Sequence, residues 1–183
     1  MPHELPRTTG RLDSSLQPAL PFPGLEVPQS FYWVLRTPAP LAGMTLPPSG
    51  TPWEGLHELG FRHVACLCSD RPLYDPAPLE WLVTLDLCDL AERSLPEDPV
   101  AEERAIRIVS RAVLARLAAG EGVIVHCAGG RGRTGTVLGC VLRGLGHPAT
   151  EVVGFLDEIH RLRGKPGWPE ADWQREVVES TPV

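Results

Sequence analysis

The sequence lacks several features of proteins that bind nucleic acids or membranes. It has no basic excess, because its 183 residues carry a formal net charge of -6 and a pI near 5.5. This argues against a broad basic face for nucleic acid or an anionic membrane. No apolar run approaches the length of a membrane span, and the first residues lack the basic start and apolar centre of a signal peptide. We therefore expect a cytoplasmic protein with no membrane span and no nucleic-acid partner.

The sequence also lacks the cysteine spacing of a disulfide framework or a zinc finger. Its cysteines form an odd set of five inside apolar segments, which favours reduced thiols. Cys66-Leu67-Cys68 is not C-x-x-C, and no Cys/His pair follows it at zinc-finger spacing. We therefore expect buried thiols, no metal site and no cofactor.

Length and patterning predict one folded domain over residues 29–183, after a proline-rich arm at 1–28. An aromatic and branched run at 31–35 is typical of a strand, and further strands are predicted at 61–68, 82–87 and 123–126. Helices are predicted at 52–59, 98–120, 150–163 and 169–179 from caps, glycine stops and apolar spacing. Another helix is predicted after the glycine-rich turn, with apolar residues at 137, 141 and 145 and an end at 144–148. This order predicts an α/β domain with a mainly parallel central sheet flanked by helices, whose ligands bind beyond the carboxyl ends of the strands.

One such strand end carries the most unusual segment, V-I-V-H-C-A-G-G-R-G-R-T-G-T-V at 123–137. A glycine-rich turn lets successive amides point at one anion, and the following helix adds its positive N-terminus. An arginine at the start of that helix can add two parallel hydrogen bonds to phosphate. We therefore predict a phosphate-binding loop made of Ala128, Gly129, Gly130, Arg131, Gly132 and Arg133.

The cysteine at the start of this loop fits nucleophilic chemistry. The positive electrostatic field that binds phosphate also favours thiolate over thiol. Cys127 is therefore predicted to attack phosphorus in line, giving a cysteinyl-phosphate that water hydrolyses. We expect His126 to hold the loop backbone, and the hydroxyl of Thr134 to donate to the departing sulfur.

The string H-C-A-G-G-R-G-R-T-G resembles the signature H-C-x-x-G-x-x-R-[S/T], a CX5R motif, of cysteine-dependent protein tyrosine phosphatases, particularly the compact dual-specificity branch. The resemblance covers about 31–178 and implies that Cys127 is the nucleophile, Arg133 binds phosphate and Thr134 assists the leaving thiolate. It also places Gln174 near the hydrolytic water. The arsenate-reductase and low-molecular-weight branches carry their cysteine loop near the N-terminus, which does not fit this chain.

These enzymes need a general acid, normally an aspartate on a mobile loop before the helix that leads to the cysteine strand. That region, residues 85–98, contains no W-P-D motif. Asp89 is the preferred acid because it follows the second strand, and Glu92 is second because it precedes Pro96 by four residues. Asp86 and Asp98 remain as weaker candidates. Cys88, beside them, is interpreted as a buried thiol rather than as a disulfide partner of the nucleophile.

Several functions stay open at this point. The chain is predicted to be an enzyme, a protein tyrosine or dual-specificity phosphatase whose partner is a phosphorylated protein or a small phosphomonoester. Arg131 keeps inositol phosphate or phosphoinositide substrates possible, because added positive charge suits a polyphosphorylated head group; RNA 5' phosphates are a further option. A phosphate-binding module without turnover is the alternative of another class. Gly130, Gly132 and Gly135 formally spell a dinucleotide fingerprint, but no acidic strand end follows about 20 residues on.

Overall fold

The computed structural model describes residues 12, 22–68 and 74–183. Its centre is a five-stranded sheet in the order β1-β2-β5-β3-β4, in which β1 and β2 are antiparallel and the other neighbours are parallel. The strands are β1 (Phe31–Leu35), β2 (Leu41–Met44), β3 (Phe61–Cys66), β4 (Glu80–Thr84) and β5 (Gly122–His126). The predicted α/β fold with a mainly parallel sheet is confirmed.

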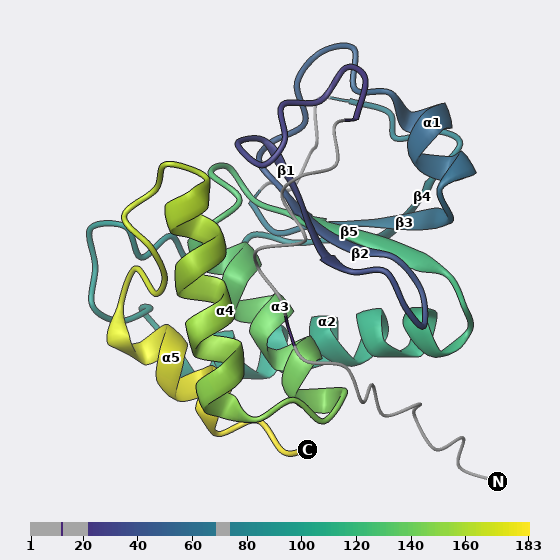
Figure 1. The fold of residues 1–183 in the computed structure, drawn as a ribbon. Coiled ribbons are helices and arrows are strands. Elements are labelled where there is room, and N and C mark those ends of the chain that lie inside the picture. Colours follow the sequence, from purple (N-terminus) through teal and green to yellow (C-terminus); the bar gives the residue numbers. More distant parts are fainter. Residues whose placement is uncertain (1–11, 13–21, 69–73) are drawn as a thin grey trace, which may run out of the picture.

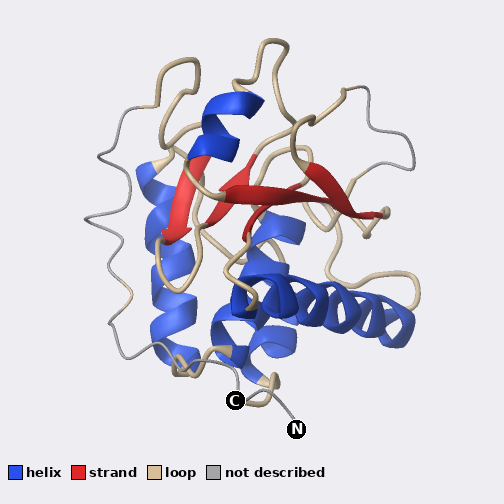
Figure 2. Cartoon of the chain, turned by 90° about the vertical axis from the view of Figure 1, so that its right-hand side faces the viewer, coloured by secondary structure: helices blue, strands red, loops and turns tan. Residues whose placement is uncertain are grey.

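Helices cover the two faces of the sheet unequally. Figure 1 shows α2, α3, α4 and α5 on one face and the short α1 on the other, and Figure 2 gives the same layers from the side. The helices are α1 (Trp53–Glu58), α2 (Pro99–Ala118), α3 (Gly132–Gly144), α4 (Ala149–Leu162) and α5 (Asp172–Glu179). The predicted apolar stripe of α2 is buried on the larger face at Ile106, Val109, Val113 and Leu117.

The smaller face is closed by aromatic side chains. Phe31 packs edge-on against Trp33 and Phe61, with ring centroids 5.4 and 6.0 Å apart. Phe22, from the proline-rich arm, lies 6.3 Å from Phe31. The described end of the arm therefore packs on the domain. The predicted boundary between residues 28 and 29 stays a prediction.

Strand β5 is central, and every residue in it is buried. A short, nearly all-apolar strand suits this place because both of its faces are covered. Cys127 follows β5 directly, and α3 begins at Gly132, so the predicted loop spans the carboxyl edge of the sheet. The fold thus positions the loop where ligands of open α/β sheets bind.

Some local predictions are wrong in detail. The strand β2 was not predicted, because Leu41–Met44 is short and follows a proline-rich stretch. Strand β4 begins at Glu80 and ends at Thr84, earlier than the predicted 82–87. The hydroxyl of Thr51 donates to the carbonyl of Pro48 at 2.7 Å and does not cap α1. Within the described residues, no helix has the length and apolar character needed to cross a bilayer.

Candidate active site

The carbonyl groups of Ala128, Gly129 and Gly130 in the phosphate loop are bound by donors from outside the loop. The Ala128 carbonyl accepts from the Leu46 amide at 3.0 Å, and the Gly130 carbonyl accepts from the Tyr32 hydroxyl at 2.8 Å. A peptide unit whose carbonyl points one way turns its N–H the other way. The loop is therefore held with amide hydrogens available on its inner side, which is the arrangement an anion requires.

A buried arginine at the end of α4 ties this outer side together. Arg163 is only 3% exposed, and its guanidinium donates to the carbonyls of Gly129 at 3.2 Å and Gly130 at 2.8 Å. It also donates to the Gln29 carbonyl at 2.9 Å and lies over the Tyr32 ring. Burial lowers the pKa of Arg163. Sequence reasoning missed this residue because its partners lie more than 30 positions away along the chain.

Close approach of the Met44 backbone requires glycine at position 130, and the Glu170 side chain crowds position 132. Gly130 has a φ of +63°, and a Cβ there would lie 2.5 Å from the Met44 carbonyl oxygen. A Cβ on Gly132 would lie 1.6 Å from a carboxylate oxygen of Glu170. No L side chain fits either place without a shift of its neighbours.

Cys127 lies at the base of this loop and is 2% exposed. The Nδ1 atom of His126 lies 3.4 Å from the Cys127 carbonyl oxygen, a long contact that places the ring against the loop backbone. The other ring nitrogen of His126 is hydrogen-bonded to the hydroxyl of Tyr74. The Thr134 side chain is fully buried in the first turn of α3, and its hydroxyl has no protein partner among the described residues.

Arg133 faces the segment that precedes α2. Its guanidinium donates to the Leu87 carbonyl at 3.3 Å and to Oδ2 of Asp89 at 2.8 Å, and it lies 3.7 Å from Oδ1 of Asp86. The structure therefore brings together Arg133 and the preferred candidate acid Asp89. Glu92 is exposed and lines a neighbouring hollow instead, beside Pro169 and Glu170.

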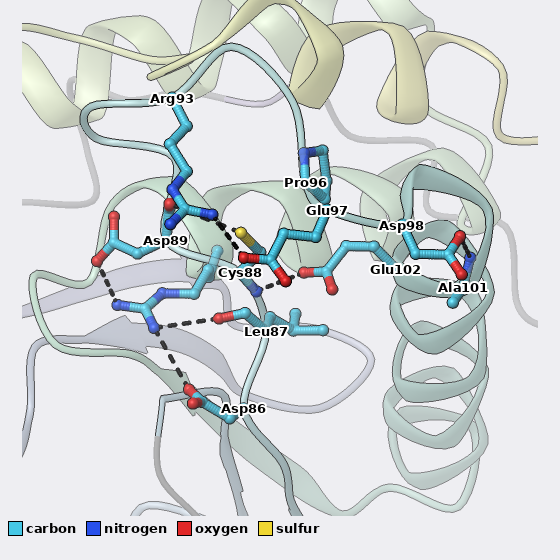
Figure 3. A pocket seen from close by; sticks show the side chains of 11 residues that line it. Asp86, Leu87, Cys88, Asp89, Arg93, Pro96, Glu97, Asp98, Ala101 and Glu102 are labelled. Carbon is cyan, nitrogen blue, oxygen red and sulfur yellow. Dashed lines mark hydrogen bonds and ion pairs between the residues drawn. The ribbon is translucent and has the colours of Figure 1, made fainter.

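Arg133 lines a cavity of about 550 Å³. Figure 3 shows the side chains of the residues around it. The charged wall of the cavity is mostly acidic. Burial raises the pKa of the Glu102 carboxyl there, and Oε1 of Glu102 accepts from the Cys88 amide at 2.6 Å. The residues that line the cavity are Asp86, Leu87, Cys88, Asp89, Arg93, Pro96, Glu97, Asp98, Ala101, Glu102 and Arg133.

Arg131 is engaged on the opposite side of the loop. Its Nε donates to the Gly167 carbonyl at 2.5 Å, and its Nη1 lies 3.5 Å from Glu170. Burial raises the pKa of Glu170 against the opposing effect of Arg131. The side-chain oxygen of Gln174 accepts from the Glu170 amide at 2.8 Å. A Cβ on Gly132 would lie 2.9 Å from Nε2 of Gln174, so Gln174 lies beside the loop.

Glu170 is the carboxylate that sequence reasoning missed. Trp168-Pro169-Glu170 has the order of aromatic residue, proline and carboxylate that residues 85–98 lack, but it follows α4 instead of preceding α2. That order was the signal available in the sequence. The indole N–H of Trp168 points to the Gly132 carbonyl at 3.5 Å, which brings the tripeptide against the loop.

The cysteines outside the loop are all free thiols. Hydrogen bonds with Cys68 and His126 lower the pKa of the Cys66 thiol. The charges of Cys127 and Arg133 act on Cys68, so this pair lies near the loop. The Cys88 sulfur lies 3.8 Å from the Asp89 carbonyl oxygen. Cys88 and Cys68 are half-buried, so the prediction of buried thiols is wrong for these two.

Comparison with known proteins agrees with this geometry. The sequence model of PTP-SAK, described as "Swiss Army Knife protein, DSP-PTPase phosphatase domain", matches residues 28–169. The chain is similar to Tk-PTP in its active form, with 25% identity and a TM-score of 0.53 over 77% of this chain and 90% of that one.

Two further solved structures show the same fold at lower identity. PTPMT1 in complex with PI(5)P is 19% identical, with a TM-score of 0.58 over 77% of this chain and 88% of that one. TpbA of P. aeruginosa in complex with pTyr is 16% identical, with a TM-score of 0.54 over 81% and 83%.

The family match spans most of the chain and includes the complete loop, so the dinucleotide interpretation of the three glycines is dropped. It also includes the strand before the loop and the helix after it. The chain belongs to the PTP-SAK family of dual-specificity-type phosphatase domains within the cysteine-based protein tyrosine phosphatase superfamily.

Proposed function

We propose that the chain hydrolyses phosphomonoesters through a cysteinyl-phosphate on Cys127. The observation that carries this is the loop whose carbonyls are bound from outside while its cysteine lies buried at the base. Amides that already point inward stabilise the charge of a transferring phosphoryl group without reorganising during the reaction. Ala128, Gly129, Gly130, Arg131 and Gly132 supply the loop, and Arg133 completes it.

Each step has a proposed residue. On phosphate binding, the Arg133 guanidinium donates parallel N–H groups to the phosphoryl oxygens. Cys127 then attacks phosphorus, and the leaving oxygen takes a proton from Asp89. In the second half, water attacks the cysteinyl-phosphate and gives a proton to the Asp89 carboxylate, which restores the acid. The sulfur departs as thiolate, with the buried hydroxyl of Thr134 donating to it. Gln174 orients that water, and His126 holds the loop backbone.

The assignment of Asp89 rests on its 2.8 Å contact with Arg133, which places its carboxyl at the mouth of the cavity. Glu170 is a second carboxyl at the loop, and its raised pKa suits proton donation. Glu92 and Asp98 lack a contact with Arg133 among the described residues. The acid is therefore tested as Asp89 against Glu170.

The experiment is hydrolysis of p-nitrophenyl phosphate and phenyl phosphate in EDTA and reductant. Cys127→Ser should lower turnover by more than about 1,000-fold, and Arg133→Lys by about 100-fold or more. Replacing the acid should slow hydrolysis of phenyl phosphate more than hydrolysis of p-nitrophenyl phosphate, because the poorer leaving group needs the proton. Asp89→Asn should show this difference, whereas Glu92→Gln, its matched control, should not. If Glu170→Gln shows it instead, the acid is Glu170.

We propose protein tyrosine or dual-specificity phosphatase activity over action on inositol polyphosphates. Arg131, which had kept the inositol option open, is bound to Gly167 and paired with Glu170. The cavity beside Arg133, which Cys127 does not line, holds five carboxylates and two arginines. This acidic neighbourhood of Arg133 disfavours a ligand with several phosphates. The five free cysteines support a reducing compartment such as the cytoplasm.

The substrate class is tested by comparing kcat/KM for a phosphotyrosyl peptide with that for an inositol polyphosphate. A preference of at least tenfold for the peptide is expected, and it should shrink as salt screens the acidic wall. Faster hydrolysis of the inositol compound would contradict the proposal. If the wild type binds vanadate but turns over neither substrate, the chain is a phosphate-binding module.

A further inference from the structure

Three metal-ligating side chains gather beside the phosphate loop, outside the groups that the proposed reaction uses directly on phosphate. Cys66 ends β3 and His126 ends β5, and the two residues are paired in the parallel register of these strands. Paired residues of neighbouring strands point to the same face of a sheet, and Cys68 follows Cys66 by two positions. The two Sγ atoms and a ring nitrogen of His126 all lie within 4.8 Å of one another.

These ligand types suit a soft cation. Zinc is bound by thiolates at about 2.3 Å and by imidazole at about 2.1 Å, so its tetrahedral ligands are about 3.6–3.8 Å apart. The observed cluster has to contract by about 1 Å at most, which small side-chain rotations supply. Three protein ligands with an open fourth position form a recognised zinc geometry. Carboxylate-binding cations such as Mg²⁺ do not prefer this set.

The surroundings of the cluster resemble the supporting shell of a metal site. Cys66 and His126 are buried, and Cys68 is partly exposed, which leaves an entry path. The Tyr74 hydroxyl bonds one ring nitrogen of His126, and the Tyr74 ring stacks on Trp53 with centroids 5.5 Å apart. Tyr74 is thus held against His126, one of the three ligand residues. Hydrogen-bonded and aromatic neighbours of this kind fix ligand orientation.

We propose that Cys66, Cys68 and His126 form a binding site for one Zn²⁺ ion or a similar soft divalent cation. Water or the Tyr74 hydroxyl completes the coordination. Binding displaces the remaining thiol protons to solvent and involves no electron transfer. Sequence analysis predicted no metal site because Cys66-Leu67-Cys68 lacks the C-x-x-C spacing, and the third ligand, His126, lies 58 positions from Cys68.

The site lies one residue from the nucleophile, so its occupancy should reach the loop. His126 contacts the Cys127 carbonyl through Nδ1 and Tyr74 through Nε2. A bound cation takes one of these nitrogens, and the ring must turn away from its present partner. The expected consequence is inhibition of turnover by zinc, a part of the inference that rests on the proposed function.

Metal binding is measured in the Cys127→Ser variant, which removes the nucleophile as a competing ligand. Titration with Co²⁺ under anaerobic conditions should give one ion per chain and a thiolate-to-cobalt charge-transfer band that Zn²⁺ abolishes. Adding Cys68→Ser or His126→Asn should weaken binding by more than about 100-fold, since loss of a supporting residue alone costs 10–100-fold. Adding Cys88→Ser, the matched control, should change neither stoichiometry nor the band.

Two outcomes would overturn the site: no charge-transfer band in folded Cys127→Ser protein, or unchanged Co²⁺ affinity after Cys68→Ser. Near-ultraviolet circular dichroism verifies that each variant is folded, and Cys68 is the chosen thiol because it is partly exposed. Prior oxidation of Cys66 and Cys68 to a disulfide would also remove the band, and a thiol count before titration identifies that case.

Inhibition is measured separately in the wild type with the Cys127 thiol intact. Zinc should inhibit at a concentration more than about 100-fold lower than in the Cys68→Ser variant. Equal inhibition of both would place inhibitory zinc on Cys127 and overturn the coupling between site and loop. If the chain binds Co²⁺ as expected but hydrolyses no phosphomonoester, the proposed function fails while the metal site stands.

Discussion

Replacing Arg163 with methionine removes the donors behind the phosphate loop and keeps a side chain of similar length. The carbonyls of Pro28, Gln29 and Gly129 lose their Arg163 bonds, while the Gly130 carbonyl keeps the Tyr32 hydroxyl. A hydrogen bond from a charged donor contributes about 1.5–3 kcal/mol. Relief from burying the guanidinium offsets part of this, so a net loss of about 2–4 kcal/mol is expected.

The assay combines thermal unfolding with vanadate affinity measured well below the midpoint. For a domain of this size, about 1 kcal/mol corresponds to about 2–4 °C, so Tm should fall by about 4–16 °C. Vanadate affinity and kcat/KM should fall by about 10–100-fold, because a loop displaced by about 1 Å misplaces its amides. Tyr32→Phe should lower the free energy of unfolding by less, about 1 kcal/mol, since Arg163 still donates to the Gly130 carbonyl.

Arg143→Met is the matched control. Arg143 also donates to a backbone carbonyl, that of His147 at 2.7 Å, but at the far end of α3 from the loop. Its replacement should lower Tm while folded protein keeps its vanadate affinity. Folded Arg163→Met protein with wild-type vanadate affinity would refute the supporting role of Arg163. The Tyr32→Phe and Arg163→Met effects should also be non-additive, because both residues bond the same carbonyl.

Three further predictions address the loop, the fold and pH. Gly130→Ala should cost more than about 2 kcal/mol and abolish vanadate binding, because it combines a positive φ with a Cβ contact of 2.5 Å to Met44; wild-type affinity would contradict this. Asp98→Ala should lower the free energy of unfolding in urea by about 1 kcal/mol, because Asp98 accepts from the Ala101 amide at the start of α2. Asp98→Asn should keep most of the wild-type stability, because asparagine also caps helices. Burial raises the pKa of Glu170 above its ordinary 4.5, so the folded chain holds this proton more tightly than the unfolded chain. That stabilisation is complete below pH 4.5 and is lost as pH rises through the raised pKa. If the free energy of unfolding of Glu170→Gln depends on pH over this range as that of the wild type does, the prediction is refuted.

The sequence predicted the parts of the fold that depend on neighbouring residues. The buried strand Gly122–His126, the capped helix from Pro99 and the glycine-rich loop between strand and helix were all found from local patterns. Strand β2 was not, because four residues with no alternation carry little periodic signal. Its place between β1 and β5 is set by tertiary pairing.

The residues of the candidate site also differ in how well the local sequence predicts them. Cys127, Arg133 and the loop glycines lie within seven consecutive residues, so their spacing alone indicated a phosphate cradle. Asp89 was preferred for its place after a strand, and the structure brings it to Arg133. Glu170 was missed because the search for an acid was confined to the segment before α2.

The supporting side of the loop explains why a local motif cannot specify the whole site. The loop carbonyls are bound by residues from β1, from the segment after β2, from the end of α4 and from the Trp168 segment. None of these donors lies within the motif, and ordinary residue types fill their positions. The inner, substrate-facing side needs fixed chemistry at fixed spacing, whereas the outer side needs only donors at the right points in space. Related loops can therefore be supported by unrelated residues, and the contribution of each must be read from the fold.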